Sequence, residues 1–98
     1  MALSIDPNEN ELNALNRATD WRRKRVIEIG CGNGRLTLRL ARLGARVFAI
    51  DPDAKLIRAA RLNLPKRLAR RIDYRIGKAE RLSQPDNSFD RAVFSWVL

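Results

Sequence analysis

The chain of 98 residues contains no histidine and only one cysteine, Cys31. A single cysteine excludes an internal disulfide and a metal site built from several cysteines, and the absence of histidine excludes zinc sites and acid–base catalysis that depend on imidazole. No apolar run approaches the ~20 residues needed to cross a bilayer. Residues 1–20 show no basic region followed by an apolar core, so we expect no secretory signal and a cytoplasmic location.

Acidic residues are scarce beside basic ones: 11 Asp and Glu stand against 20 Lys and Arg, which gives a formal net charge of +9. The basic residues cluster at 22–25, 66–67 and 70–71. Such clusters can bind nucleic acid or an anionic lipid surface. Because they are divided among separate segments and aromatic residues are few, we interpret them as a solvated surface and keep nucleic-acid binding as the alternative.

The apolar pattern predicts helices that alternate with strands, which favours a parallel sheet. Gly44 is placed to end one helix, and Asp53 is placed to cap the next. The alternation at 72–76 indicates a strand towards a sheet edge. We expect helices at 10–21, 35–43 and 54–64, strands at 26–29, 45–50, 72–76 and 91–94, and a frayed lead-in at 1–9. In the helix at 54–64, Leu56, Ile57, Ala60 and Leu64 are expected to face inward, and Trp21 and Trp96 are interpreted as packing residues.

The most informative segment is the loop Gly30-Cys31-Gly32-Asn33-Gly34, directly after the first of these strands. Alternate glycines let the backbone turn sharply into a helix and let a ligand lie close to it. The dinucleotide fingerprint requires a third glycine where Arg35 stands, so a dinucleotide is disfavoured. Glu28 suggests a ligand that carries positive charge, and Asp51, at the end of the second strand, is placed to accept hydrogen bonds from ribose hydroxyls. Cys31 is interpreted as a small loop residue, because a nucleophilic cysteine needs a histidine partner.

These residues also have simpler structural interpretations. The glycine loop could be a tight strand–helix turn without a ligand, and Asp51 could be an acid favoured near a helix N-terminus by the macrodipole. We favour a ligand site, because the loop, Asp51 and the segment 77–90 point to it independently.

Residues 26–37 resemble motif I of the class I S-adenosylmethionine-dependent methyltransferases, E/D-x-G-x-G-x-G, and 47–51 resemble their second motif. Residues 77–90 are similar to the GDAE-x-LPF-x-x-x-SFD stretch of the small-molecule, type 11-like branch, and 91–98 to the strand-four segment after it. The resemblance covers residues 20–98. It implies an α/β fold: a Rossmann-like three-layer sandwich whose parallel sheet has the order 3-2-1-4, truncated before strands 5–7. Residues 1–21 would be a helical lead-in, and 22–98 the N-terminal part of the S-adenosylmethionine-binding domain.

The resemblance also implies where the cofactor, S-adenosylmethionine, would lie. The acid and loop of motif I would line its methionine end with Ser95, Asp51 would hold the ribose, and Pro52 and Leu56 would flank the adenine beside the Ala79 amide. Lys78 stands where the family usually has an acid that accepts a hydrogen bond from the adenine amino group, and lysine can only donate. The implied cofactor-binding residues are Glu28, Gly30, Cys31, Gly32, Asn33, Gly34, Asp51, Pro52, Leu56, Ala79, Glu80 and Ser95.

The implied activity is methyl transfer to an unidentified acceptor, a small molecule or a lipid. Such a reaction needs positioning and desolvation more than dedicated catalytic groups. The alternatives are a noncatalytic cofactor-binding fragment, a pseudo-enzyme subunit that needs a partner, and a fragment of an RNA methyltransferase. We expect no appreciable turnover from these residues alone. We also expect strand 91–94 to be an exposed apolar edge, and the chain to self-associate through residues 91–98.

Overall fold

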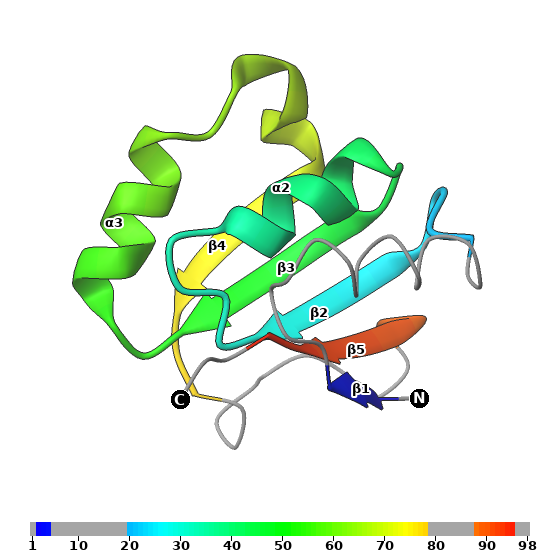
Figure 1. The fold of residues 1–98 in the computed structure, drawn as a ribbon, viewed down its shortest axis with the longest axis horizontal. Coiled ribbons are helices and arrows are strands. Elements are labelled where there is room, and N and C mark those ends of the chain that lie inside the picture. The colour runs from blue at the N-terminus through cyan, green and yellow to red at the C-terminus, as the bar shows by residue number, and fades with distance from the viewer. Residues whose placement is uncertain (1, 5–19, 79–87, 96–98) are drawn as a thin grey trace.

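The computed structural model describes residues 2–4, 20–78 and 88–95. Within them, five strands form one parallel sheet in the order β1-β5-β2-β3-β4 (Figure 1). The strands are β1 (Ala2–Ser4), β2 (Arg25–Ile29), β3 (Arg46–Asp51), β4 (Ile72–Ile76) and β5 (Arg91–Phe94). Strands β4, β3, β2 and β5 stand in the predicted 3-2-1-4 order, so the predicted Rossmann-like fold is confirmed.

Two α-helices and a 3-10 helix connect the strands: α2 (Arg35–Arg42), α3 (Ala54–Leu62) and η1 (Lys66–Arg71). Gly44 ends α2 as predicted: its N–H donates to the Ala41 carbonyl, and its φ of 101° turns the chain so that the Ala45 N–H reaches the Leu40 carbonyl. Asp53 caps α3 as predicted, because its side chain accepts hydrogen bonds from the N–H groups of Lys55 and Leu56.

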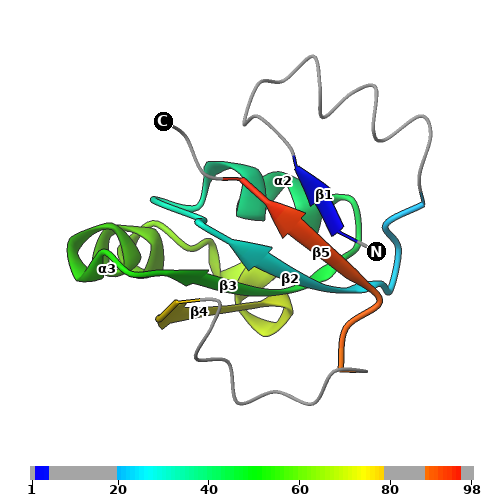
Figure 2. The same cartoon turned by 90° about the horizontal axis from the view of Figure 1, so that it is seen from below.

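Helices α2 and α3 pack on one face of the sheet and share a single hydrophobic core with it (Figure 2). Alternate strand residues point into this core, including Val26, Val47 and Tyr74. The prediction that Leu56 faces this core is wrong, because its side chain is 38 % exposed. The adjacent Ile57 occupies the buried face of α3, and one residue along a helix turns the side chain by about 100°.

Strand β1 corrects two predictions, that residues 1–9 are only a frayed lead-in and that strand 91–94 is an exposed edge. Ala2, Leu3 and Ser4 pair in parallel with Ala92, Val93 and Phe94, so β5 has a neighbour on each side. An open sheet edge offers unpaired N–H and C=O groups that any extended segment can satisfy. A strand of three residues has too few positions for a periodic pattern, so the sequence does not predict it.

The predicted helix at 10–21 falls mainly on residues outside the described part, which resumes at Asp20. Trp21 itself is buried in the core, in agreement with its interpretation as a packing residue, and Trp96 lies outside the described residues. Among the described residues, no helix has the length and apolar character needed to cross a membrane.

Candidate functional site

The carboxyl ends of β2, β3 and β5 meet at the glycine loop that joins β2 to α2 (Figure 1). The loop is fastened to β3, because the N–H groups of Gly30 and Cys31 both donate to the Ile50 carbonyl, at 2.9 and 3.0 Å. Gly30, Gly32 and Gly34 all have positive φ, at 82°, 57° and 89°. L-residues rarely adopt this conformation, so the sharp turn from strand to helix depends on glycine.

Gly34 is constrained by its neighbour as well as by its φ. A Cβ at Gly34 would lie 2.2 Å from the hydroxyl oxygen of Tyr74, whose side chain extends from β4 to the glycine loop. A Cβ at Gly32 would have nothing within 4 Å. Within the described residues, the space beside Gly32 is therefore open, whereas the space beside Gly34 is filled.

Glu28 lies at the centre of this edge, and its carboxyl group is completely buried. Thr37, from the first turn of α2, donates its hydroxyl to Glu28 Oε1, and Ser95, directly after β5, donates to Oε2. Burial raises the pKa of Glu28, and the negative charge of Asp51 raises it further, whereas the two hydroxyl donors act in the opposite direction. Glu28 is thus a hydrogen-bonded acid in a strongly desolvated position.

Asp51 ends β3 at the opposite side of the glycine loop and is 9 % exposed. Its Oδ2 accepts the Gly32 N–H at 2.9 Å, and its Oδ1 accepts the Asp53 N–H at 2.8 Å. Each carboxylate oxygen can accept a second hydrogen bond, so the group keeps acceptor capacity for a ligand hydroxyl. The contact with Gly32 holds this carboxylate beside the open part of the loop.

The burial of Cys31 supports the interpretation of this residue as a small residue of the loop. Its side chain is buried, and burial raises the pKa of the thiol, with the negative charges of Glu28 and Asp51 acting in the same direction. A nucleophilic or metal-binding cysteine requires the thiolate, which this position disfavours.

The geometry of this edge corresponds to a known family. The family model described as "Methyltransferase domain" matches residues 26–98. The chain belongs to this methyltransferase family.

Curated relatives with similar sequences carry the name ubiquinone biosynthesis O-methyltransferase. One from Methylocella silvestris is 45 % identical over 74 residues, which are 76 % of this chain and 28 % of that protein. One from Xanthomonas oryzae is 37 % identical over 84 residues, which are 85 % of this chain and 35 % of the relative. The chain therefore spans only about a third of the length of these relatives.

Solved methyltransferases have the same fold. An S-adenosylmethionine-dependent methyltransferase from Mesorhizobium loti has a TM-score of 0.72 and 28 % identity, over 86 % of this chain and 38 % of that one. Magnesium protoporphyrin IX methyltransferase from Synechocystis, solved with bound S-adenosylmethionine, has a TM-score of 0.74 and 22 % identity, over 88 % of this chain and 41 % of that one. At 22 % identity the second likeness concerns the fold alone.

The structure brings most of the residues predicted for the site to this one edge. Asn33 is exposed within the glycine loop, Pro52 is exposed directly after β3, and Leu56 is exposed on the first turn of α3. Ala79 and Glu80 lie outside the described residues, so their predicted contacts with adenine stay predictions. The rest of the predicted set, Glu28, Gly30, Cys31, Gly32, Gly34, Asp51 and Ser95, lies in or directly against the loop and its hydrogen bonds.

Sequence reasoning missed Thr37 and Tyr74. Thr37 is a fully buried polar side chain in a helix whose other buried residues are Leu36, Leu40 and Ala41. A β-branched hydroxyl residue on the apolar side of a helix is the signal that could have identified it. Tyr74 occupies an inward position of the alternating strand β4. A tyrosine hydroxyl at a buried position usually has a hydrogen-bond partner, and this is the signal that could have identified Tyr74.

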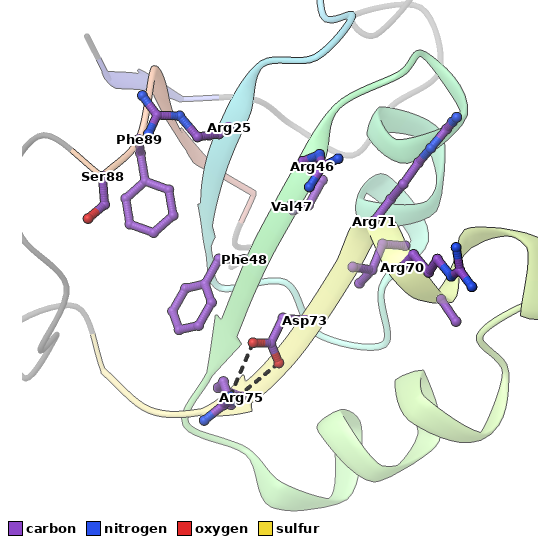
Figure 3. A pocket seen from close by; sticks show the side chains of 12 residues that line it. Arg25, Arg46, Val47, Phe48, Arg70, Arg71, Asp73, Arg75, Ser88 and Phe89 are labelled. Carbon is purple, nitrogen blue, oxygen red and sulfur yellow. Dashed lines mark hydrogen bonds and ion pairs between the residues drawn. The ribbon is translucent and has the colours of Figure 1, made fainter.

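A hollow of about 570 Å³ extends along β3 and β4, from Arg25 and Arg46 at the amino ends of β2 and β3 to Arg75 near the carboxyl end of β4 (Figure 3). Arginines from four segments line it, and the Phe48 and Phe89 rings approach with centroids 5.8 Å apart. Arg25 and Arg75 are already paired, with Asp90 and Asp73. Part of the positive charge is therefore neutralised locally, and nucleic-acid binding stays a prediction.

Proposed function

We propose that this chain is the S-adenosylmethionine-binding portion of a methyltransferase whose acceptor is a small molecule or a lipid. Membership of the methyltransferase family supports the reaction class, and S-adenosylmethionine is the cofactor of that class. The observation that carries the proposal is the carboxyl edge of the sheet, where two acids flank an open glycine loop. The name shared by the curated relatives favours an acceptor oxygen on a quinone precursor.

The residues present suit this cofactor. Glu28 supplies negative charge against the cationic methionine end, and the loop from Gly30 to Gly34 supplies bare backbone. Asp51 keeps acceptor capacity for the two ribose hydroxyls, and Gly32 leaves room beside it. The exposed side chains of Pro52 and Leu56 offer apolar surface for the adenine ring. The bound cofactor would supply the methyl group on a sulfonium, and these side chains would hold and orient it.

The proposal is tested by isothermal titration of the folded chain with S-adenosylmethionine and S-adenosylhomocysteine. We expect both ligands to bind, and we expect Asp51→Asn to weaken both about 10- to 100-fold, because it removes a charged acceptor for ribose. The matched control is Asp53→Asn, two residues away, because asparagine retains the helix cap. Absence of binding at millimolar ligand, or equal effects of the two variants, would contradict the proposal.

We propose in addition that the 98 residues bind cofactor without measurable turnover, because they span about a third of the relatives' length. A transfer assay with labelled methyl groups tests this.

Self-association through residues 91–98 also stays a proposal, and β1 now competes for the same edge. Light scattering after size-exclusion chromatography tests it, and a monomer at high concentration would contradict it.

A further inference from the structure

The carboxyl group of Glu28 lacks a positively charged partner. No ion pair within the described residues includes it, although the chain carries 20 Lys and Arg. In the described part of the chain, its two oxygens accept hydrogen bonds from the neutral hydroxyls of Thr37 and Ser95. A buried carboxylate without a cation is expensive, because desolvation penalises the charged form.

Among residues 2–4, 20–78 and 88–95, the titratable groups that interact with Glu28 from neighbouring elements are acids. They are Asp51 at the end of β3, Cys31 in the glycine loop and Tyr74 on β4. Burial raises the pKa of Tyr74 to about 12 and raises the pKa of Cys31 as well, so both are neutral near pH 7. The charge that acts on Glu28 from the described residues is therefore the negative charge of Asp51, which favours the protonated form of Glu28.

Ser95 allows both protonation states of Glu28 to be satisfied. Its hydroxyl oxygen contacts Glu28 Oε2 and also lies 3.2 Å from the Gly30 carbonyl oxygen, but it has one hydrogen to donate. When Glu28 is ionised, Ser95 donates to the carboxylate. When Glu28 is protonated, its O–H can donate to Ser95 Oγ, and Ser95 can donate to Gly30. The geometry accommodates either arrangement without moving a heavy atom.

We propose that Glu28 carries a proton in the cofactor-free chain and releases it when the cationic methionine end of S-adenosylmethionine binds. In this step the O–H bond of Glu28 breaks, the electron pair stays on the carboxylate, and the proton leaves to solvent. Thr37 and Ser95 then both donate to the carboxylate, which faces a positively charged ligand. The proposal rests on the cofactor assignment made above.

The test is isothermal titration of the folded chain with S-adenosylmethionine at pH 6, in buffers of different ionisation enthalpy, such as phosphate and imidazole. A released proton is taken up by the buffer, so the observed heat should differ between buffers by an amount that corresponds to as much as one proton per ligand. The apparent affinity should rise with pH, at most tenfold per unit, until the pKa of Glu28 is passed.

Two comparisons isolate Glu28. The neutral nucleoside 5′-methylthioadenosine has the adenine and ribose but no cationic end, so it should bind with the same heat in all buffers. Glu28→Gln should bind S-adenosylmethionine about 10- to 100-fold more weakly and without proton release, because a charged contact is lost. The same variant should bind methylthioadenosine as the unaltered chain does, which shows that it is folded.

A positioning role for Thr37 gives a separate readout. Thr37→Val removes one donor to the carboxylate, so the pH at which proton release disappears should move upwards, and Thr37→Ser should restore it. S-adenosylmethionine that binds with buffer-independent heat would overturn the proposal and leave the cofactor assignment intact. Undiminished release in Glu28→Gln would also overturn it. No binding of either ligand would overturn the assignment and the proposal together.

Discussion

The two ends of the sheet use acids and bases in opposite ways. At the amino end, Arg25, Arg46 and Arg91 each open a strand, and the acid Asp90 lies exposed in an ion pair with Arg25. At the carboxyl end, Glu28 is buried without an ion pair among the described residues and is bound by hydroxyls. Hydrogen bonds from the backbone N–H and then the guanidinium of Arg25 lower the pKa of the exposed acid, whereas desolvation raises the pKa of the buried one. The difference shows that burial, rather than residue type, decides what an acid does here.

The largest effect is expected from Gly34→Ala at the carboxyl end. The new Cβ would lie 2.2 Å from the Tyr74 hydroxyl oxygen, and φ of 89° is unfavourable for alanine. Overpacking and backbone strain together should lower the free energy of unfolding by about 2–5 kcal/mol, measured by urea denaturation. Gly32→Ala is the control, and it should cost only about 1–2 kcal/mol because its surroundings are open.

A double variant sharpens this result. Tyr74→Phe removes a buried hydroxyl that has no hydrogen-bond partner among the described residues. It should restore part of the stability of Gly34→Ala, since the nearest ring atom would then be 3.0 Å away. Equal costs for Gly32→Ala and Gly34→Ala would mean that Tyr74 does not constrain the loop.

The second effect concerns pH. The folded-state pKa of Glu28 is raised above its ordinary value of 4.5, so the folded chain binds the proton more tightly than the unfolded chain. Its contribution to stability is fully present below the unfolded pKa and is lost as pH rises through the folded pKa, with a slope of at most about 1.4 kcal/mol per unit. Glu28→Gln should remove this loss in denaturation curves measured from pH 4 to 8. Parallel curves for the two proteins would contradict it.

The fold was predictable from the sequence because its strands and helices have clear apolar periods and recognisable ends. The bounds of the strands at 72–76 and 91–94 agree with the prediction, and Gly44 and Asp53 act as expected. Strand β1 was not predictable, because it depends on an open edge that only the folded sheet creates. Whether such a short segment forms a strand is decided by the segments it pairs with in the folded structure, and the local sequence does not contain that information.

The site was predictable only as far as its motif reached. The glycine loop, Glu28 and Asp51 could be located because glycine and acid at those spacings have a direct physical meaning. Thr37 and Tyr74 contact the site from α2 and β4 through the three-dimensional packing, and no spacing rule connects them to the loop. Leu56 shows the opposite error: the helical period was used to place it on the buried face together with Ile57, but its side chain is exposed.

At the amino end, we expect a smaller effect whose dependence on pH is opposite to that of Glu28. The backbone N–H and the guanidinium of Arg25 hydrogen-bond to Asp90 and lower the pKa of that carboxyl group. Asp90 therefore contributes stability above its unfolded pKa, and the contribution is lost as pH falls through the lower folded pKa. Asp90→Asn should reduce stability at pH 7, and the loss should shrink in acid. A loss that stays constant from pH 7 to pH 2 would contradict the assignment.

The smallest effect is expected from Asp20→Asn. Arg22 lowers the pKa of Asp20 to about 2, chiefly through a side-chain hydrogen bond, so any contribution is present above 3.8 and is lost towards pH 2. The two residues are only two positions apart and both side chains are largely exposed, whereas 65 positions separate Arg25 from Asp90. A contact this local can persist in the unfolded chain, which cancels most of its effect on stability. We therefore expect no measurable change in the urea midpoint at pH 7. If Asp20→Asn lowers the urea midpoint as much as Asp90→Asn does, an exposed ion pair stabilises this end of the sheet without joining distant segments. Burial alone would then distinguish the acids at the two ends.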